Sequence, residues 1–465
     1  MSKNSLNRRD FLSSAAVVGA TGAIGAGPLL TSCGGPKEPP LVPLRPQSEW
    51  NIPSDPLPDR AIDGRELKVG LVGCGGQGTG DLMSLLSVAD NIKVVALGDT
   101  FQDRINGCRR QLSERYNQTV PDEMCFIGFD AYQKVINAGI DMVMLITPPA
   151  FRPAQFKAAV DAGVHVFMEK PMAVDPVGVR AILMAARQAE QQRLCVINGT
   201  QRRHARRYVE AYKLVQSGLI GDIVSANVYW NQQKLWHRDK DPRWTDMEWM
   251  VRDWVNWNWL SGDHITEQHI HNIDVFHWFS HLTPVRCVGF GARQRRPTGD
   301  QFDMFSVDYI YEGGVHVHSM CRQIDGTHGN VSERIQGTKG VWSSNGRITD
   351  LQGNELWRFD REKEEEEYEV RNEFQLQFVN WVTRIRNNDP INQAEETAHS
   401  TLAAIMGRIS AYTGAQVTWE EVMAMDLDIV PTDLSLRNMD LSQFPVPTPG
   451  RGPNDPRPEQ QRRRT

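Results

Sequence analysis

The sequence predicts an α/β protein in which a doubly wound parallel sheet is followed by a second α/β domain with a mainly antiparallel open sheet. Short apolar runs bounded by glycine begin at residue 67 and alternate with stretches of helical character, as strands and helices do in doubly wound sheets. After Gly221 the runs become longer and alternate between apolar and polar residues, which favours antiparallel strands. With 465 residues and 40% hydrophobic content, the chain can bury two cores.

The parallel sheet is predicted from short, charge-poor runs that have the length of buried strands. They cover residues 67–72, 93–97, 141–146, 165–168 and 194–198. The stretches of helical character between or after them cover residues 78–89, 104–116, 130–138, 152–162 and 177–191. We expect a six-stranded domain over residues 66–199, of whose strands these runs account for five.

The second domain, residues 200–430, is predicted from four longer strands. They cover residues 223–230, 285–292, 305–311 and 315–322. Val307, Tyr309 and Tyr311 alternate with other residues, so one face of this sheet should be covered. Candidate helices at residues 264–279 and 372–386 are expected to cover it, and residues 431–465 form a proline-rich tail.

The first 33 residues have the pattern of an export signal. Two arginines within residues 7–12 precede a charge-free stretch over residues 13–30, as in twin-arginine signals, and residues 30–33 resemble a lipobox that ends in Cys33. The alternative, a membrane-spanning helix, is disfavoured because the stretch is rich in glycine and alanine. Residues 34–65 are predicted to be a proline-rich linker, and the protein is predicted to be exported, either periplasmic or a membrane-anchored lipoprotein.

Charge and cysteine content narrow the partners. The net charge of −6 arises from 57 acidic and 51 basic side chains that are mixed along the chain, so no nucleic-acid partner is expected and small molecules are favoured. The acidic run at residues 362–369 is interpreted as a solvated strand edge or loop rather than a cation site. The cysteines other than Cys33 show neither a CxxC pair nor a disulfide framework, which favours small buried side chains and disfavours a structural metal.

A glycine-rich turn after the first predicted strand indicates a dinucleotide site. It has the pattern G-x-G-x-x-G and contains Gly73, Gly75, Gly76, Gln77 and Gly78. Glycine allows a pyrophosphate to approach backbone amides at the start of a helix. Asp99 follows 21 residues after Gly78, where a carboxylate can accept hydrogen bonds from a ribose and repel the 2′-phosphate of NADP. We therefore predict a Rossmann domain that binds NAD, with NADP less favoured.

Three further motifs follow the glycine turn and Asp99. They are Thr147-Pro148-Pro149, Glu169-Lys170-Pro171 and the spacing of Glu267, His271 and Asp274. With these motifs in this order, the chain resembles, from residue 66 to about residue 430, the glucose-fructose oxidoreductase/inositol dehydrogenase/rhizopine catabolism (Gfo/Idh/MocA) family. The resemblance implies that Lys170 lies near the nicotinamide and the substrate and that His271 serves in proton transfer. Arg104, Thr147, Pro148, Glu169 and Lys170 are then further cofactor-binding candidates, and Glu267 is a third catalytic candidate. The family also suggests a homo-oligomer.

The chemistry of these residue types agrees with the resemblance, although other interpretations exist. Removal of hydride from a carbinol carbon needs a base for the hydroxyl proton, which a histidine or a lysine with a lowered pKa can provide. Alternatively, Lys170 contacts only phosphate or ribose, and His269, His271 or His277 packs in a core. A metal cluster of His264, His269 and His271 is disfavoured because no second ligand group stands out, and no metal site is predicted.

The substrate side is predicted from aromatic and polar residues. Eight tryptophans fall between residues 230 and 278, and aromatic faces stack on the C–H faces of sugars, although most of these rings should belong to the core or to a subunit interface. The candidate substrate contacts are Arg202, Trp236, His271 and Asp274. Two departures from the family leave details open: the turn continues as Ala150-Phe151-Arg152, and Glu267 replaces the usual aspartate.

The resulting hypothesis is an NAD(P)-dependent oxidoreductase that acts on a sugar or polyol hydroxyl, with NAD as the favoured cofactor. Because free NAD is scarce outside the cytoplasm, an exported enzyme is expected to retain its cofactor. One alternative is an NAD-dependent redox-neutral glycosidase that works by oxidation and elimination, which the absence of a Tyr-Pro-Thr-His stretch disfavours. A second alternative is a non-catalytic carbohydrate-binding lipoprotein, which the presence of both Lys170 and His271 disfavours.

Overall fold

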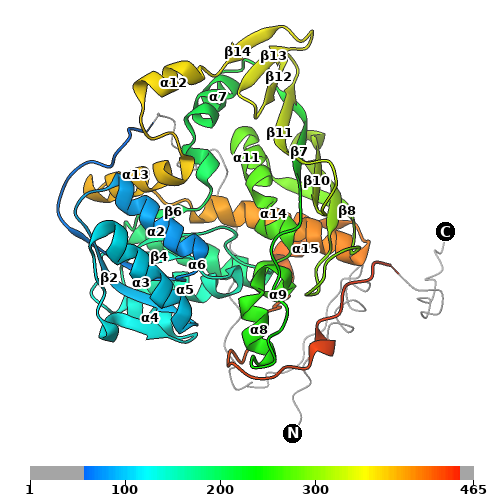
Figure 1. The fold of residues 1–465 in the computed structure, drawn as a ribbon. Helices are drawn as coiled ribbons and strands as arrows, with labels where there is room; N and C mark the ends of the chain where they lie inside the picture. Colours follow the sequence, from blue (N-terminus) through cyan, green and yellow to red (C-terminus); the bar gives the residue numbers. More distant parts are fainter. Residues whose placement is uncertain (1–56, 451–465) are drawn as a thin grey trace, which may run out of the picture.

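The computed structural model describes residues 57–450 (Figure 1). The predicted export signal, Cys33, most of the predicted linker and the last part of the tail lie outside the described residues. Within the described residues, no helix combines the length and the apolar character that a membrane crossing requires.

The first domain contains a six-stranded parallel sheet with the order β3-β2-β1-β4-β5-β6. The strands are β1 (Leu67–Val72), β2 (Ile92–Asp99), β3 (Cys125–Ile127), β4 (Met142–Leu145), β5 (His165–Met168) and β6 (Val196–Asn198). The order reverses between β1 and β4, and ligands of doubly wound sheets bind at such a point, beyond the carboxyl ends of the strands. The predicted doubly wound sheet is confirmed.

Five helices connect or flank these strands. They are α2 (Gly76–Val88), α3 (Gln102–Tyr116), α4 (Ala131–Ile136), α5 (Arg152–Asp161) and α6 (Pro176–Gln191). Helix α6 begins where the carboxylate of Asp175 accepts a hydrogen bond from the amide of Gly178 at 2.7 Å. By contrast, α2 begins at the glycine turn without a side-chain cap, so its first amides stay available to a ligand.

The second domain contains a nine-stranded mixed sheet with the order β14-β13-β12-β11-β7-β10-β9-β8-β15. The strands are β7 (Ile223–Gln232), β8 (Pro284–Ala292), β9 (Met304–Tyr311), β10 (His316–Gln323), β11 (Asn330–Gly337), β12 (Gly340–Ser343), β13 (Arg347–Asp350), β14 (Glu355–Arg358) and β15 (Val417–Thr418). β7 and β10 pair in parallel, and the other neighbours are antiparallel. Val307, Tyr309 and Tyr311 are buried as the alternation predicted, and the mainly antiparallel sheet is confirmed.

The remaining helices comprise two short 3-10 helices of the first domain and the helices that follow β6 in the sequence. The α-helices are α7 (Arg206–Gln216), α8 (Asp246–Arg252), α9 (Asn258–Ser261), α10 (His264–Glu267), α11 (Ile270–Ser280), α12 (Arg361–Glu367), α13 (Glu373–Arg386), α14 (Ala394–Thr413) and α15 (Trp419–Ala424). The 3-10 helices are η2 (Asp122–Met124), η3 (Pro149–Phe151), η4 (Gln201–His204), η5 (Trp254–Asn256), η6 (Glu312–Gly314) and η7 (Leu441–Gln443). The helix expected over residues 264–279 is therefore divided between α10 and α11.

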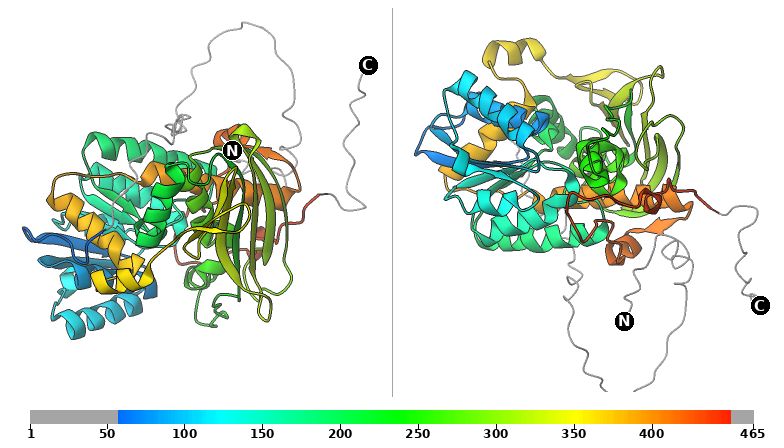
Figure 2. Two further views of the ribbon diagram at one scale, coloured as in Figure 1. Left: turned by 90° about the horizontal axis from the view of Figure 1, so that it is seen from above. Right: turned by 60° about the horizontal axis from the view of Figure 1, so that its bottom comes forward.

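The expectation that residues 372–386 cover the second sheet was wrong. Helix α13 packs on α2, and its Phe378 lies 4.6 Å from Phe167 of β5, ring centroid to ring centroid. Helix α11 does cover the second sheet, as expected for residues 264–279. In place of α13, the sheet is also covered by α14, which packs on α6 as well and so lies between the domains (Figures 1 and 2). Helical periodicity indicates which face is buried but does not identify the surface that buries it.

The acidic run forms a short exposed helix rather than a strand edge or loop. Asp360 caps α12 by accepting a hydrogen bond from the amide of Lys363 at 2.9 Å, and α12 has no buried residue. The run remains solvated, as expected, and only its backbone conformation differs from the expectation.

The C-terminal segment, residues 425–444, lies across both domains as a strap (Figure 2). The amide of Ile429 donates to Asp175 at 3.0 Å, and the amide of Met439 donates to Asp246 of α8 at 3.0 Å. The amide of Met247 donates to the carbonyl of Arg437 at 3.0 Å. The strap therefore holds α8 in place relative to the first domain.

Candidate functional site

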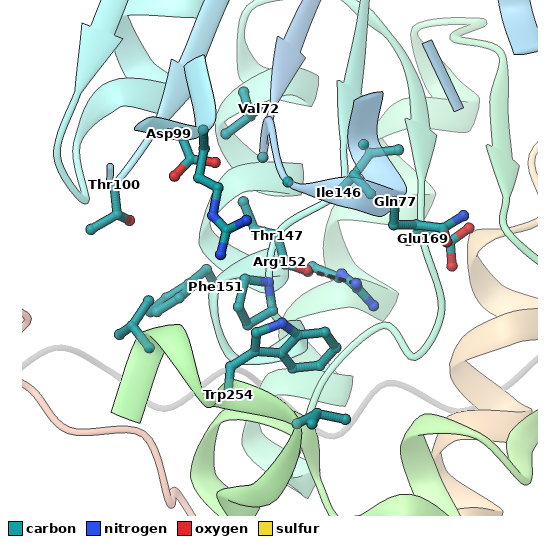
Figure 3. A pocket seen from close by; sticks show the side chains of 18 of the residues that line it. Val72, Gln77, Asp99, Thr100, Ile146, Thr147, Phe151, Arg152, Glu169 and Trp254 are labelled. Carbon is teal, nitrogen blue, oxygen red and sulfur yellow. Dashed lines mark hydrogen bonds between the residues drawn. The ribbon is translucent and has the colours of Figure 1, made fainter. Parts of the chain in front are cut away.

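A cavity of about 690 Å³ lies beyond the carboxyl ends of the first sheet, where the two domains face each other (Figure 3). The first domain contributes the glycine turn, the end of β2, the turn after β4 and the residues after β5. The second domain contributes η4, β7, η5 and the region of α10 and α11. The position is the one that doubly wound sheets use for ligands.

The four glycines of the turn have two different roles. A Cβ at Gly73, whose φ is +97°, would lie 2.4 Å from the carbonyl oxygen of Ile146, and a Cβ at Gly78 would lie 1.8 Å from that of Gly73. These two glycines permit the close packing of strand, turn and helix. A Cβ at Gly75 or Gly76 would meet nothing within 4 Å and would occupy ligand space, since both residues line the cavity. This open backbone at the start of α2 fits a pyrophosphate.

Asp99 stands at the end of β2 and shapes the same turn. Its carboxylate accepts hydrogen bonds from the amides of Cys74 at 2.7 Å and Phe101 at 2.9 Å. Burial raises the pKa of Asp99, while these two hydrogen bonds act in the opposite direction. Asp99 and Arg104 both line the cavity, as does Gln77, whose side-chain amide donates to Asp81 at 2.9 Å.

The turn after β4 holds a buried cation that sequence reasoning noted only as a departure from the family. The guanidinium of Arg152 donates to the carbonyls of Thr147 and Pro171, each at 2.6 Å (Figure 3). Burial lowers the pKa of Arg152 to about 10, although Glu169 and Glu267 oppose the change. Arg152 joins the turn after β4 to the residues after β5, and it lines the cavity together with Thr147 and Pro148.

Lys170 connects the two domains inside the cavity wall. Its Nζ donates to the carbonyl oxygen of Glu267 at 2.5 Å and to the carboxylate Oε1 at 2.9 Å. Gln268 donates to the other carboxylate oxygen. Burial raises the pKa of Glu267, but the ion pair with Lys170 outweighs it, so the pKa lies below its usual value. The predicted catalytic residues Lys170 and Glu267 are thus in direct contact.

Glu169 lines the cavity beside this pair and is itself buried. Burial raises its pKa, although the charges of Lys170 and Arg152 oppose this change. A Cβ at Gly199 would lie 2.3 Å from Oε1 of Glu169, so only glycine leaves room for the carboxyl group there. Burial and the charge of Glu169 also raise the pKa of the neighbouring Asp81.

His271 lines the cavity at the start of α11, beside Lys170 and Glu267. Its ring stacks on Trp230 of β7, with 5.5 Å between centroids and 24° between planes. Burial, followed by the charges of Lys170 and Arg202, lowers the pKa of His271 well below its usual value. The imidazole is therefore neutral at physiological pH and able to accept a proton.

The predicted substrate contacts divide into two groups. Trp236 and His271 line the cavity, and Trp230 and Trp254 do so as well. The structure does not bring Arg202 and Asp274 to the cavity wall. Arg202 forms an ion pair with buried Glu333, and Asp274 accepts two hydrogen bonds, each at 2.9 Å, from Arg203. Their charges are compensated inside the second domain, which explains why Asp274 is buried and Arg202 is largely so.

The histidines considered as a metal cluster have other partners. Nε2 of His269 lies 2.7 Å from the hydroxyl of Ser319, and Nδ1 of His264 lies 3.0 Å from the carboxylate of Asp263. Among residues 57–450, no group of three or more histidine, cysteine or carboxylate side chains is arranged to hold a metal ion. The six cysteines in the same range are free thiols, and five of them are buried.

Sequence reasoning missed several cavity residues. They are Arg152, Leu235 and Gln268. Gln268 directly follows the predicted Glu267, so proximity to a motif could have identified it. Leu235 carries no such signal, because it comes from an irregular segment that only the tertiary structure brings to the cavity. Gln201, beside the candidate Arg202, and Trp254, one of the eight tryptophans, were marked by the sequence and do line the cavity.

Comparison with known families matches both domains. The model described as "Oxidoreductase family, NAD-binding Rossmann fold" matches residues 67–199. The model described as "GFO/IDH/MocA C-terminal domain" matches residues 208–343. The two matches follow the order of the two sheets.

Curated relatives include two inositol dehydrogenases. Inositol 2-dehydrogenase 1 of Saccharopolyspora erythraea is 27% identical over 171 residues, which are 37% of this chain and 48% of the relative. Inositol 2-dehydrogenase of Salmonella typhimurium is 27% identical over 213 residues, which are 46% of this chain and 54% of the relative. The chain spans about half the length of these curated relatives.

Solved structures with the same fold cover more of the chain. Scyllo-inositol dehydrogenase from Lactobacillus casei with bound NAD(H) and scyllo-inositol is 21% identical, with a TM-score of 0.58 over 76% of this chain and 99% of that one. Aldose-aldose oxidoreductase from Caulobacter crescentus, complexed with glycerol, is 18% identical, with a TM-score of 0.60 over 76% of this chain and 100% of that one. At these identities the likeness shows the fold alone.

Proposed function

Because this chain belongs to the Gfo/Idh/MocA family, we propose that it is an NAD-dependent oxidoreductase that removes hydride from a CH–OH carbon of a sugar or polyol. The observation that carries the proposal is that one cavity contains both the open glycine turn and the group formed by Lys170, Glu267 and His271. Both parts are needed for such a reaction, and they come from different domains. The names of the relatives, inositol dehydrogenases, support a polyol as the substrate.

The residues around the turn fit NAD. Gly75 and Gly76 leave backbone open at the start of α2, where the helix dipole favours a diphosphate. The carboxylate of Asp99 can accept hydrogen bonds from a ribose and repels a 2′-phosphate, so NAD is favoured over NADP. Bound NAD supplies a hydride acceptor, a chemistry that amino-acid side chains lack.

The residues at the other end of the cavity handle the proton. His271, which is neutral, accepts the hydroxyl proton of the substrate as its carbon loses hydride. Lys170 is held by Glu267 and has an ammonium that can hydrogen-bond the oxygen on which negative charge develops. Arg152 fixes the backbone after β4 and β5 and thereby the position of Lys170.

We also propose that the cofactor is retained between turnovers. Helices α8 and η5 of the second domain cover the first-domain part of the cavity and are called its roof below. Val251, Trp254 and Val255 line this roof. Arg252 closes it by donating to Asp103 of α3 at 3.2 and 3.4 Å and by placing its guanidinium 3.8 Å from the ring centroid of Phe101. The strap holds α8 from its other side.

Retention of the cofactor also fits the redox-neutral glycosidase, in which hydride returns to the substrate. The two functions differ in their products. An oxidoreductase leaves a carbonyl compound and reduced cofactor, or passes the hydride to a second sugar, whereas the glycosidase releases an alcohol from a glycoside with no net oxidation. Product analysis on matched free sugars and their glycosides therefore separates them.

Export and lipid anchoring are the third part of the proposal, and they rest on the twin-arginine pattern and on Cys33. Replacement of Arg8 and Arg9 by lysine should keep the protein in the cytoplasm. Cys33→Ser should leave it exported but should release it from the membrane fraction. Membrane association that is unchanged in Cys33→Ser would contradict the anchor.

The direct test of the function uses the full chain, purified gently. Nucleotide is extracted and identified by mass spectrometry, and the protein is mixed with a panel of inositols, aldoses and their glycosides. The proposal expects NAD in the extract and growth of the reduced-nicotinamide absorbance with at least one polyol or sugar. A folded protein that binds a sugar but holds and accepts no nucleotide would contradict the proposal and favour the carbohydrate-binding alternative.

A further inference from the structure

Trp230 contacts two basic side chains, which belong to different elements. Its ring stacks on His271 of α11, as described above, and the guanidinium carbon of Arg202, on η4, lies 5.4 Å from its ring centroid. Arg202 does not line the cavity, whereas Trp230 and His271 do. Arg202 therefore stands behind the cavity wall, in contact with the ring on which His271 rests.

Glu333 of β11 fixes this arrangement from behind. It forms an ion pair with Arg202, and the side chains of the pair are 12% and 1% exposed for Arg202 and Glu333 respectively. It also accepts hydrogen bonds from the hydroxyl of Tyr208 at 3.0 Å and from the side-chain amide of Asn272 at 2.6 Å. Asn272 directly follows His271 on α11, so the same carboxylate holds both Arg202 and the backbone that carries His271.

We propose that Glu333, Arg202 and Trp230 form a positioning assembly that holds the ring of His271 against Trp230, with a fixed positive charge behind it, for proton transfer. This proposal rests on the function proposed above and assigns to Arg202 a different role from substrate contact. Trp230 provides a flat surface that restricts rotation of the imidazole. Arg202 provides a fixed positive charge behind that surface, and its partner Glu333 keeps it in place.

The charged groups around His271 also favour its neutral form. Lys170 after β5, Arg202 on η4 and His269 between α10 and α11 each lower its pKa, in addition to burial. Glu267 on α10, the carboxylate that pairs with Lys170, carries a negative charge that acts in the opposite direction and that burial and the cations outweigh. Loss of the Arg202 charge should therefore raise the pKa of His271.

The test measures the titration of His271 directly in the full chain. Histidine labelled with ¹³C or ¹⁵N is incorporated, and the resonance of His271 is identified by its absence in His271→Gln. In Arg202→Gln the titration midpoint should rise by about one unit, equivalent to a tenfold change in the protonation equilibrium. Arg202→Lys, which keeps the charge, should restore a midpoint close to that of the unchanged protein.

A second variant addresses folding. Arg202→Gln alone leaves a buried carboxylate without its cation, so the double variant Arg202→Gln/Glu333→Gln keeps a hydrogen-bonded neutral pair of similar shape. The matched control is Arg207→Gln, which removes a cation that lies over Tyr208 and pairs with Glu373 instead of contacting Trp230. The control should leave the midpoint of His271 unchanged.

An unchanged midpoint of His271 in folded Arg202→Gln would overturn the proposal, as would an equal shift in Arg207→Gln. In Arg202→Gln/Glu333→Gln the midpoint should rise less than in Arg202→Gln, because the opposing carboxylate charge is removed as well. Trp230→Leu should increase the mobility of the His271 ring in relaxation measurements, and a ring that remains as rigid would also contradict it. These readouts need no substrate, so they are independent of the proposed oxidoreductase activity. Once a substrate has been identified, the acid limb of the pH profile of kcat should move to higher pH in Arg202→Gln. In Arg202→Lys it should lie where it does in the unchanged protein.

Discussion

The ammonium of Lys170 donates hydrogen bonds to both the backbone carbonyl and the side-chain carboxylate of Glu267, a residue of the other domain. The side chains are 9% and 7% exposed, so the ion pair is almost wholly removed from water. Removal of one partner from a buried pair leaves an uncompensated charge, which costs more than removal of both.

Glu267→Gln should therefore lower the free energy of unfolding by about 3 kcal/mol. Lys170→Met/Glu267→Met should lose clearly less than the sum of the two single changes to methionine. Urea unfolding of Glu267→Gln and of the four proteins in the double-mutant cycle measures both. As a control, Asp161→Asn in the exposed pair with Lys157, 48% and 61% exposed, should cost about 1 kcal/mol or less. Additive single and double effects at Lys170 and Glu267 would contradict the coupling.

The glycine turn offers a matched series of alanine substitutions. Gly76→Ala should fold normally but weaken NAD binding by tenfold or more, because its Cβ projects into open cavity space. Gly78→Ala should disrupt the turn, because its Cβ would lie 1.8 Å from the carbonyl oxygen of Gly73. Gly80→Ala on the exposed side of α2 meets nothing within 4 Å and should be neutral or stabilising. Circular dichroism reports folding, and titration of nucleotide-stripped protein reports affinity; full affinity in Gly76→Ala would argue against a diphosphate in the turn.

Arg252 is expected to control how long the cofactor stays bound. Arg252→Ala removes the ion pair with Asp103 and the contact with Phe101, so the roof should open more often. The amount of NAD left after prolonged dialysis should fall several-fold relative to the unchanged protein. Arg243→Ala removes an exposed arginine that pairs with Asp241 in the segment before α8, and it should not alter retention. Equal retention in all three proteins would contradict the role of the roof.

The buried His204 should make the protein sensitive to acid. Neither ring nitrogen has a hydrogen-bond partner among the described residues, and burial, followed by the charge of Arg203, lowers its pKa to about 3. The folded state therefore keeps His204 neutral while the unfolded state takes up a proton below about pH 6.5. This group removes stability as the pH falls from about 6.5 towards 3, at about 1.4 kcal/mol per pH unit.

His204→Leu should remove that contribution. The difference in unfolding free energy between pH 7 and pH 5, measured with urea, should shrink by roughly 2 kcal/mol relative to the unchanged protein. Loss of stability on acidification distinguishes His204 from a buried carboxyl group with a raised pKa. Such a group, for example Asp175 with a pKa of about 6, adds stability as the pH falls over this range. The same pH dependence in both proteins would mean that His204 is protonated, or solvated, in the folded state.

The first sheet and its turn were predictable because their signals are local. Glycines, strand and helix occur within a few residues at positions 67–88, and Asp99 ends the next strand. The strand β3 was not located because it has only three residues, which is too short to show a strand pattern, and Ile127 at its end is exposed. The order of the motifs, through the family resemblance, placed Lys170 and His271 in one cavity.

The positions of charged residues and amphipathic helices in the fold depend on partners that are remote in sequence. Arg202 was expected at the substrate, but Glu333, which is 131 residues later, holds it behind Trp230. Asp274 has the spacing of a site residue, yet it binds Arg203 instead. The periodicity of α13 was correct, but the surface it covers belongs to the first domain. Sequence pattern predicts that such groups need partners, whereas the fold decides which partners they have.

The most direct test of the account is single-turnover hydride transfer in the full chain loaded with NAD. The protein is mixed rapidly with the most reactive polyol or sugar of the panel, and the reduced-nicotinamide absorbance is followed in the unchanged protein and in His271→Gln at equal nucleotide loading. The account predicts that the absorbance grows in the unchanged protein and that its rate falls by about 10²-fold or more in His271→Gln, while the bound NAD stays the same. Equal rates in the two proteins would show that the proton leaves by another route and would contradict the assignment of the cavity.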